Sequence, residues 1–292
     1  MRSAVADGDI ALVDRNCHKS LNYALNASGA VPIYLMPRRN ARGLIGPVPQ
    51  SEMAPEAVKQ KLADSALVEQ KNAKPVLAAL TNSTYDGLCY NVRTTTAELS
   101  KSVPRIHYDE AWYAYARFNS IYEGRYGMHR GERHPDDATV TTTQSTHKCL
   151  AALSQASMIH IRSGKVPVNP SLLNESFMMY TSTSPQYSLI ASTDVSAKMM
   201  ADAGEYLTDE TLVEAIAFRQ AMVRLRQEIE AKNKNYWWFG VWQPDDVNGK
   251  PFAEADPDLL RTSSDAWLLK PGAVWHGFGD LGNDYCMLDP SR

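Results

Sequence analysis

Short apolar runs alternate with amphipathic segments through the first half of the chain. The run over 75–81 is continuous and apolar, which is typical of a parallel strand covered on both faces. Pro55 near the start of one amphipathic segment suits the first turn of a helix. The pattern predicts strands over 10–13, 31–35, 75–81, 105–108 and 139–143, and helices over 19–27, 55–63 and 94–100. This alternating order predicts an α/β domain with a mostly parallel sheet.

The second half of the chain has a helical pattern instead. Leu212 and Ile216 begin an apolar face at helical spacing, and Asp209 and Glu210 lie where negative charge suits a helix N-terminus. The aromatic run that follows is interpreted as a strand. The pattern therefore predicts helices over 171–180, 185–203 and 208–232 and a strand over 236–242. We predict an incomplete large domain over 1–205, then a linking helix and the incomplete start of a smaller α+β domain over 206–292.

Composition and charge narrow the class of protein. The chain has 292 residues, of which 44% are hydrophobic and 22% charged, and its net charge is −3. The sequence contains no run of Lys and Arg that would predict a nucleic-acid surface. No apolar stretch approaches the length of a membrane span. No apolar signal core follows Arg2, so no export is implied. The four cysteines form no CxxC pair, which favours free thiols in a reducing cytoplasm.

Three polar runs carry the residues that could perform chemistry. Lys148 ends the run QSTHK and precedes an apolar segment, so its amine should lie against the core. Asp109 follows the predicted strand 105–108, at the sheet edge where α/β proteins bind ligands, although a turn or cap aspartate is the structural alternative. Glu110 should point to the other face of that strand. His18 follows the first strand within the run NCHKS, and a structural histidine is its alternative.

Other familiar site motifs are missing from the sequence. It contains no GxxxxGK[ST] or GxGxxG loop, and neither HExxH nor GxSxG. His129 and His134 lie near Asp136 and Asp137, but their spacing fits no standard metal site and is typical of a solvated loop. We therefore expect no metal.

Together, the three polar runs resemble the bacterial inducible basic amino acid decarboxylases of the Orn/Lys/Arg group. The resemblance extends from Ile10 to Pro290 and looks closest to the arginine branch. It implies a large domain of the fold type I (aspartate aminotransferase-like) class and pyridoxal 5'-phosphate (PLP) as cofactor. It also implies that Lys148 is the Schiff-base residue, that the Asp109 carboxylate faces the pyridine nitrogen, and that the His18 ring stacks on the cofactor.

Further cofactor contacts are implied by the same resemblance. Ser145 and His147 correspond to positions that hold the phosphate, and Trp112 corresponds to a tryptophan near the phenolic oxygen. Thr183 and Ser184 resemble the segment that a neighbouring subunit lends to the phosphate site. The resemblance thus implies a homodimer or higher homo-oligomer with its site at the subunit interface.

The resemblance implies decarboxylation of a basic amino acid, most closely arginine to agmatine and carbon dioxide. Each turnover consumes a proton, which fits acid resistance and polyamine metabolism. Lysine and ornithine are the alternatives, and the run NSTYDG over 82–87 looks as much like the lysine branch, although a plain turn explains it equally well. Transamination would use the same lysine and aspartate, but the match along the whole chain disfavours it.

The ends of the chain bear on a further alternative. Relatives carry segments before and after this stretch, so we expect a fragment. A non-catalytic piece with a structural or interaction role is therefore the alternative of another class.

Overall fold

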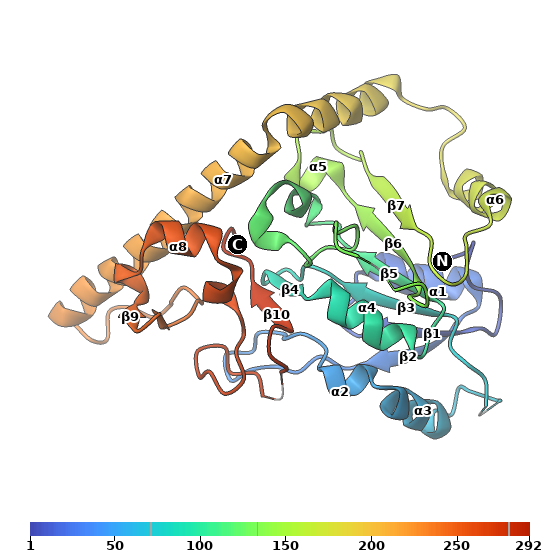
Figure 1. Ribbon diagram of the computed structural model, residues 1–292, viewed down its shortest axis with the longest axis horizontal. Helices are drawn as coiled ribbons and strands as arrows, with labels where there is room; N and C mark the ends of the chain where they lie inside the picture. The colour runs from blue at the N-terminus through green and yellow to red at the C-terminus, as the bar shows by residue number, and fades with distance from the viewer. Residues whose placement is uncertain (71, 133, 280) are drawn as a thin grey trace.

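A central sheet organises the first half of the molecule (Figure 1). The computed structural model describes residues 1–70, 72–132, 134–279 and 281–292. Within them, six strands form the sheet in the order β2-β1-β3-β5-β6-β7. All neighbouring pairs are parallel except β6 and β7, which confirms the predicted α/β class. The strands are β1 (Ile10–Asp14), β2 (Val31–Leu35), β3 (Leu77–Thr81), β5 (Arg105–Asp109), β6 (Thr139–Gln144) and β7 (Met158–Arg162).

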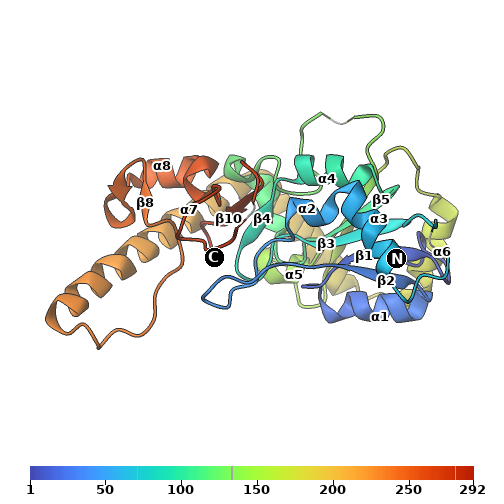
Figure 2. The same cartoon turned by 90° about the horizontal axis from the view of Figure 1, so that it is seen from below.

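Helices cover both faces of the sheet, as Figure 2 shows most clearly. One face carries α1 (Lys19–Ser28), and the other carries α2 (Gln50–Met53), α3 (Pro55–Asp64) and α4 (Val92–Ser100). The ends of α1 follow from local chemistry: His18 caps its N-terminus, and Gly29 closes its C-terminus with a left-handed φ of 71°. Burial between two layers of helices explains why β1 and β3, in the middle of the sheet, are almost wholly apolar.

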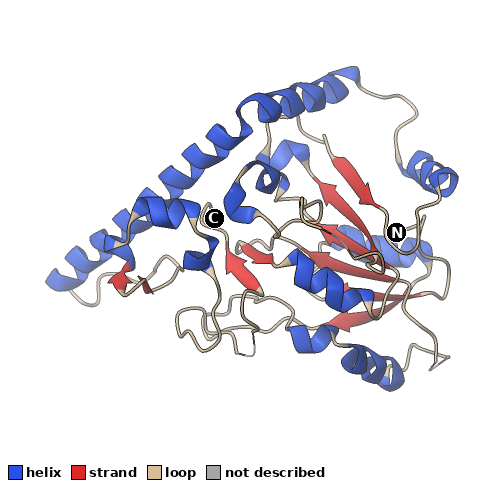
Figure 3. Cartoon of the chain, in the orientation of Figure 1, coloured by secondary structure: helices blue, strands red, loops and turns tan. Residues whose placement is uncertain are grey.

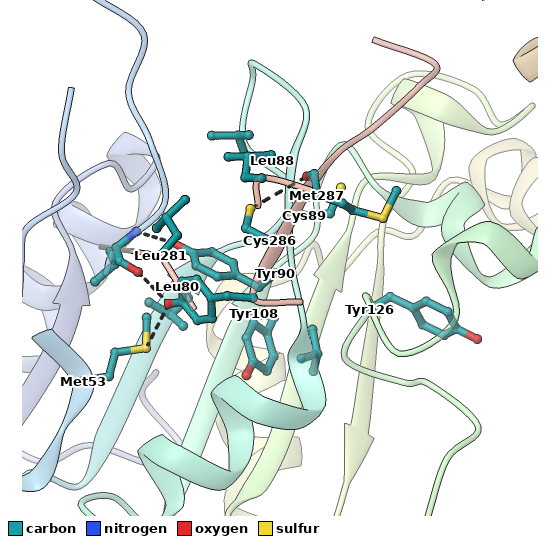
Figure 4. Close-up of a cluster of buried hydrophobic side chains, with 14 of the residues drawn as sticks. Met53, Leu80, Leu88, Cys89, Tyr90, Tyr108, Tyr126, Leu281, Cys286 and Met287 are labelled. Atoms are coloured by element: carbon teal, nitrogen blue, oxygen red, sulfur yellow. Dashed lines mark hydrogen bonds between the residues drawn. The ribbon is translucent and has the colours of Figure 1, made fainter. Parts of the chain in front are cut away.

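A second, smaller sheet joins the end of the chain to the core. Strand β4 (Leu88–Tyr90) pairs antiparallel with β10 (Cys286–Leu288). Figure 4 shows the buried side chains around this pair, including Tyr90, Tyr108 and Met287. The Tyr90 hydroxyl accepts a hydrogen bond from the Val48 amide at 2.8 Å, and the Tyr285 hydroxyl donates to the Val48 carbonyl at 2.6 Å. These paired tyrosines satisfy buried backbone groups, so residues from three distant parts of the chain share one core.

The helical second half differs from the prediction in one respect. The two helices expected over 185–203 and 208–232 are one helix, α7 (Tyr187–Lys232), which runs along the edge of the molecule after α6 (Pro170–Tyr180) (Figure 3). Gly204 does not break it, because the Phe118 ring packs where a side chain would lie. The predicted boundary at residue 205 falls inside this helix, and the division into two domains stays a prediction.

The aromatic run over 236–242 is not a strand, so that prediction was wrong. Trp238 is 87% exposed, and the Trp237 and Phe239 rings lie 4.4 Å apart, so the run packs partly on itself. The remaining elements are short. They are η1 (Ala114–Phe118), η2 (Ser120–Tyr122), α5 (Thr146–Cys149), β8 (Asp246–Val247), β9 (Lys250–Pro251), η3 (Phe252–Glu254), α8 (Pro257–Thr262) and η4 (Ser264–Trp267).

Two further findings concern possible membrane spans and the cysteines. No helix among the described residues combines the length and apolar character needed to cross a membrane. Cys17, Cys89, Cys149 and Cys286 are free thiols.

Candidate active site

A cavity of about 580 Å³ opens beyond the carboxyl ends of β1, β3, β5 and β6. This is the edge at which open α/β sheets bind ligands, and the volume lies within the range of small-molecule sites. The cavity brings together five of the eight predicted site residues, which lie far apart in the sequence. They are His18, Asp109, Trp112, Ser145 and Lys148.

The turn that carries His18 is held by a buried aspartate. Asp14 ends β1 and is 1% exposed; its carboxylate accepts hydrogen bonds from the Asn16 amide at 2.8 Å and the Thr81 amide at 3.3 Å. Burial raises the pKa of Asp14 to about 6, and the two amide donors oppose that rise. The Thr81 hydroxyl also donates to the Asn16 carbonyl at 3.1 Å. These bonds tie the end of β1 to β3 and fix where the chain turns toward the cavity.

His18 caps a helix and also lines the cavity, while its role as a ring that stacks on a cofactor stays a prediction. Its Nδ1 lies 2.8 Å from the Ser20 hydroxyl and accepts from the Ser20 amide, so the ring caps α1. The same residue lines the cavity and is exposed there. Because capping uses only Nδ1, the remainder of the ring is available to contact a ligand.

Asp109 and His107 reach the cavity from the same strand. They are two positions apart on β5, so their side chains share one face of the sheet, and both line the cavity. Asp109 Oδ1 accepts from the Ala111 amide at 3.2 Å. Burial, together with the nearby amino group of Met1, lowers the pKa of His107 to about 4, and Asp109 opposes the change. His107 is therefore neutral at pH 7, and the Asp109 carboxylate is the acidic side chain of this strand in the cavity.

An aromatic wall faces Lys148. Its amine lies 4.9 Å from the centroid of the Trp112 ring, and the Tyr85 ring lies 5.4 Å from the same ring. The Cys149 thiol donates to the Trp112 carbonyl at 3.3 Å, which ties α5 to this wall. The Arg292 guanidinium carbon lies 5.7 Å from the same ring. A cation over an aromatic face is stabilised, so the ring holds the Lys148 amine close to the cavity.

Three predicted phosphate contacts lie outside the cavity lining. His147 Nδ1 bonds the Ala156 carbonyl at 2.8 Å. Thr183 and Ser184 are exposed in the segment between α6 and α7. Their assignment to the phosphate site of a neighbouring subunit stays a prediction.

Some residues of the cavity were not singled out from the sequence. His107 could have been found from its spacing of two from Asp109 on a predicted strand. Tyr85 follows β3 in a turn whose tip is Asp86-Gly87, with a φ of 79° at Gly87, so the turn interpretation of that run is confirmed. Its exposed ring gives no hydrophobic pattern that could have placed it.

Glu110 does lie on the opposite face from Asp109, as expected, and it is completely buried. Burial raises the pKa of Glu110 to about 7, while hydrogen bonds from Gly127, Gln144 and Asn82 lower it. This carboxylate is behind the cavity wall and contacts no part of the cavity.

The donor set of the cavity fits PLP. An amine, a carboxylate, an imidazole, an indole and a hydroxyl converge on one space, from Lys148, Asp109, His18, Trp112 and Ser145. These are the groups needed to bond an aldehyde, pair with a ring nitrogen, pack on a ring and bind oxygen atoms. Among the described residues, no group of three or more His, Cys, Asp and Glu gathers as a metal site would require.

Comparisons with known proteins point to the same chemistry. The family model described as "Orn/Lys/Arg decarboxylase, major domain" matches residues 1–292. The chain is 48% identical to a lysine decarboxylase from Pseudomonas aeruginosa, over 99% of this chain and 37% of that protein. It is 46% identical to the biodegradative arginine decarboxylase of Escherichia coli, over all of this chain and 40% of that protein.

Solved structures agree with the sequence comparisons. The structure of lysine decarboxylase A from Pseudomonas aeruginosa matches 99% of this chain and 37% of its own length, with a TM-score of 0.89 and 47% identity. The chain therefore spans well under half the length of the relatives that it matches.

Proposed function

The chain belongs to the Orn/Lys/Arg decarboxylase family, and from this membership we propose that it carries the cofactor site of a PLP-dependent decarboxylase of basic amino acids. The observation that supports the proposal most directly is the meeting of Lys148, Asp109 and His18 in one cavity at the carboxyl ends of the strands. An amine, a carboxylate and a ring from three separate runs would have no common purpose if they were only a surface charge, a turn residue and a helix cap.

Each residue has a distinct task in this proposal. PLP, when bound, withdraws electrons from the carbon that loses the carboxyl group. Lys148 would hold the cofactor covalently, and the Asp109 carboxylate would keep a proton on its ring nitrogen. The His18 ring would pack on the flat cofactor. An aromatic contact of this kind contributes about 0.5–1.5 kcal/mol. Trp112 and Ser145 would donate hydrogen bonds to cofactor oxygens.

The reaction balances with one proton. An amino acid carboxylate and a proton become an amine and carbon dioxide, so the carbon that loses the carboxyl group gains a proton at the same position. This consumption of protons supports a role in acid resistance in the cytoplasm, as the family resemblance implies. Lys148, which lines the cavity and lies over the Trp112 ring, would exchange with the substrate amine.

Within the class of basic amino acids, arginine and lysine are the first substrate candidates. The sequence resemblance favours arginine, through the run EAWYAYARF over 110–118 and the stretch 267–290. The 48% identity to a lysine decarboxylase and the 46% identity to an arginine decarboxylase weigh almost equally. An assay with both amino acids decides between them: agmatine formed faster than cadaverine supports arginine, and the reverse order assigns lysine. Ornithine, tested through putrescine, is the third candidate.

The proposal includes a homo-oligomer that completes the site. Thr183 and Ser184 are exposed and lie away from the cavity, so they could reach a phosphate in the site of a second copy. A mixed assembly tests this: chains with Lys148→Ala and chains with both Thr183→Ala and Ser184→Ala should regain activity when combined. No recovery in mixed assemblies whose two parents each form oligomers would contradict the shared site.

The experiment that tests the function is reduction with borohydride in the presence of PLP, followed by peptide mass mapping. We expect a pyridoxyl group on Lys148, no such group in Lys148→Ala, and unchanged labelling in Lys198→Ala. Lys198 is an exposed lysine on α7 that pairs with Asp202, so it is a matched control. Labelling scattered over surface lysines would overturn the proposal and favour a structural or interaction role for the chain.

A further inference from the structure

A buried carboxylate lies directly behind the cavity wall, on the face of the sheet opposite Asp109. Glu110 follows β5 and has no exposed surface. Its Oε1 accepts hydrogen bonds from the Gly127 amide at 2.6 Å and from Asn82 Nδ2 at 3.2 Å. Its Oε2 accepts from Gln144 Nε2 at 3.1 Å. The three donors satisfy a charge that would be very unfavourable if buried without partners.

The side chains that bind Glu110 come from the ends of neighbouring strands. Asn82 follows β3 directly, and Gln144 is the last residue of β6. Each is followed within a few residues by a cavity residue, Tyr85 after Asn82, and Ser145 and Lys148 after Gln144. One carboxylate therefore bridges the ends of β3, β5 and β6 at the points where they turn toward the cavity.

Backbone hydrogen bonds run alongside this carboxylate. The Asn82 amide donates to the Asp109 carbonyl at 2.8 Å, and the Glu110 amide donates to the Thr143 carbonyl at 2.9 Å. Asn82 is itself fully engaged, because its Nδ2 also donates to the Arg125 carbonyl and its Oδ1 accepts from the Tyr90 amide. The strand ends thus depend on side chains as well as on the sheet ladder.

The loop that carries Gly127 is built to approach this carboxylate closely. A side chain at Gly127 would collide with the Thr142 methyl group, so only glycine allows its amide to reach Glu110. A buried carboxylate with so close an amide donor is a specific arrangement, and an apolar residue of the same size would pack without any of these bonds.

We propose that Glu110 is a positioning residue of the active site, which holds the strand ends carrying Asp109 and Lys148 in register. The purpose of this role rests on the proposed function, whereas the hydrogen-exchange test below does not depend on that function. Glu110 acts through its neighbours, since its side chain does not line the cavity. Without it, the Gln144 amide would be buried without an acceptor and the Asn82 amide would keep only the Arg125 carbonyl, so the turns that follow them would loosen.

Hydrogen exchange of the cofactor-free chain measures the positioning directly. In Gln144→Met, which removes one donor to the carboxylate, we expect amides over 80–86, 108–113 and 143–149 to exchange about tenfold faster or more. Glu110→Met should have a larger effect on the same three stretches. Glu110→Gln should leave them near their normal rates, because its carbonyl oxygen can still accept from Gly127 and its amide can donate to a rotated Gln144.

A matched control separates positioning from general loss of stability. Gln220 is equally buried, and its amide donates to the Phe252 and Ala255 carbonyls, away from the cavity. Gln220→Met should leave exchange over the three strand ends unchanged even where it lowers the melting temperature. Labelling of Lys148 by PLP and borohydride should follow the exchange result, falling in Gln144→Met and Glu110→Met but not in Glu110→Gln or Gln220→Met.

The possible outcomes are distinct. Normal exchange over the three stretches in Gln144→Met would overturn the inference, and so would a similar acceleration in Gln220→Met. If the unmodified chain takes up no PLP at Lys148, the proposed function fails, while the exchange rates still decide the role of Glu110. If Glu110→Met does not fold, Gln144→Met and Glu110→Gln give the answer without it.

Discussion

Asp14 should make the protein less stable as pH rises through the range in which this group titrates. The side chain is 1% exposed, and burial raises its pKa from the usual 3.8 to about 6. The folded state thus holds this proton more tightly than the unfolded state. Between about pH 4 and 6 the unfolded state binds fewer protons, so the free energy of unfolding falls as pH rises. The difference between the two pKa values corresponds to about 3 kcal/mol.

Asp14→Asn isolates this contribution. The amide keeps an oxygen that can accept from Asn16, and it carries no charge at any pH. Urea unfolding of both proteins, followed by tryptophan fluorescence at several pH values, gives the difference in their free energies of unfolding. We expect the free energy of unfolding of the variant, relative to that of the wild type, to rise by about 3 kcal/mol between pH 3.5 and pH 7. Asp64→Asn changes an exposed aspartate on α3 and is the control. Its free energy of unfolding relative to the wild type should not change with pH. A flat difference for Asp14→Asn as well would refute the reasoning.

Three further predictions concern the cavity and its wall. Asp109→Asn should lower decarboxylation by about 10²–10³-fold while PLP still labels Lys148, because an amide cannot hold the ring-nitrogen proton as a carboxylate does; a nearly normal rate would exclude that role. Trp112→Leu removes the ring 4.9 Å from the Lys148 amine and should slow labelling about threefold or more; an unchanged time course would contradict this. Gly127→Ala places a methyl group against Thr142 and should lower the free energy of unfolding by about 1–3 kcal/mol, measured by urea unfolding, whereas a neutral effect would mean that the loop can move away.

The sequence predicted the sheet well because its strands are buried between helices. A strand covered on both faces is a continuous apolar run, and β3 and β1 were recognised in this way. β7 was missed because its side chains are half-buried or exposed and give no such run. The prediction divided α7 into helices over 185–203 and 208–232, and the gap between them contains Gly204, a residue of low helix propensity. Packing against Phe118 decides the outcome there, and the sequence does not reveal that contact.

The candidate site could be predicted as far as it depends on strand ends and family motifs. Asp109 ends β5 and Lys148 follows β6, and parallel strands end at one edge, so their meeting could be expected from the pattern. The wall formed by Trp112 and Tyr85 could not, because it depends on how two turns fold back toward each other. The hydrogen-bond partners of Glu110 were also beyond prediction, since they come from three separated segments and carry no common motif.

The two buried carboxylates, Asp14 and Glu110, share a structural role that neither the sequence motifs nor the fold class predicts. Asp14 joins the end of β1 to the Thr81 amide of β3, and Glu110 joins β3 through Asn82 to β5 and to Gln144 of β6. Four consecutive strand ends are thereby linked by side chains at the edge where the cavity opens. Burial raises the pKa of both groups, to about 6 and about 7, so each makes the folded state less stable once it is charged. Apolar residues of similar size could fill both positions at less cost, but they could not accept these bonds. The stability lost at these two positions is therefore best explained by the geometry that they impose on the cavity.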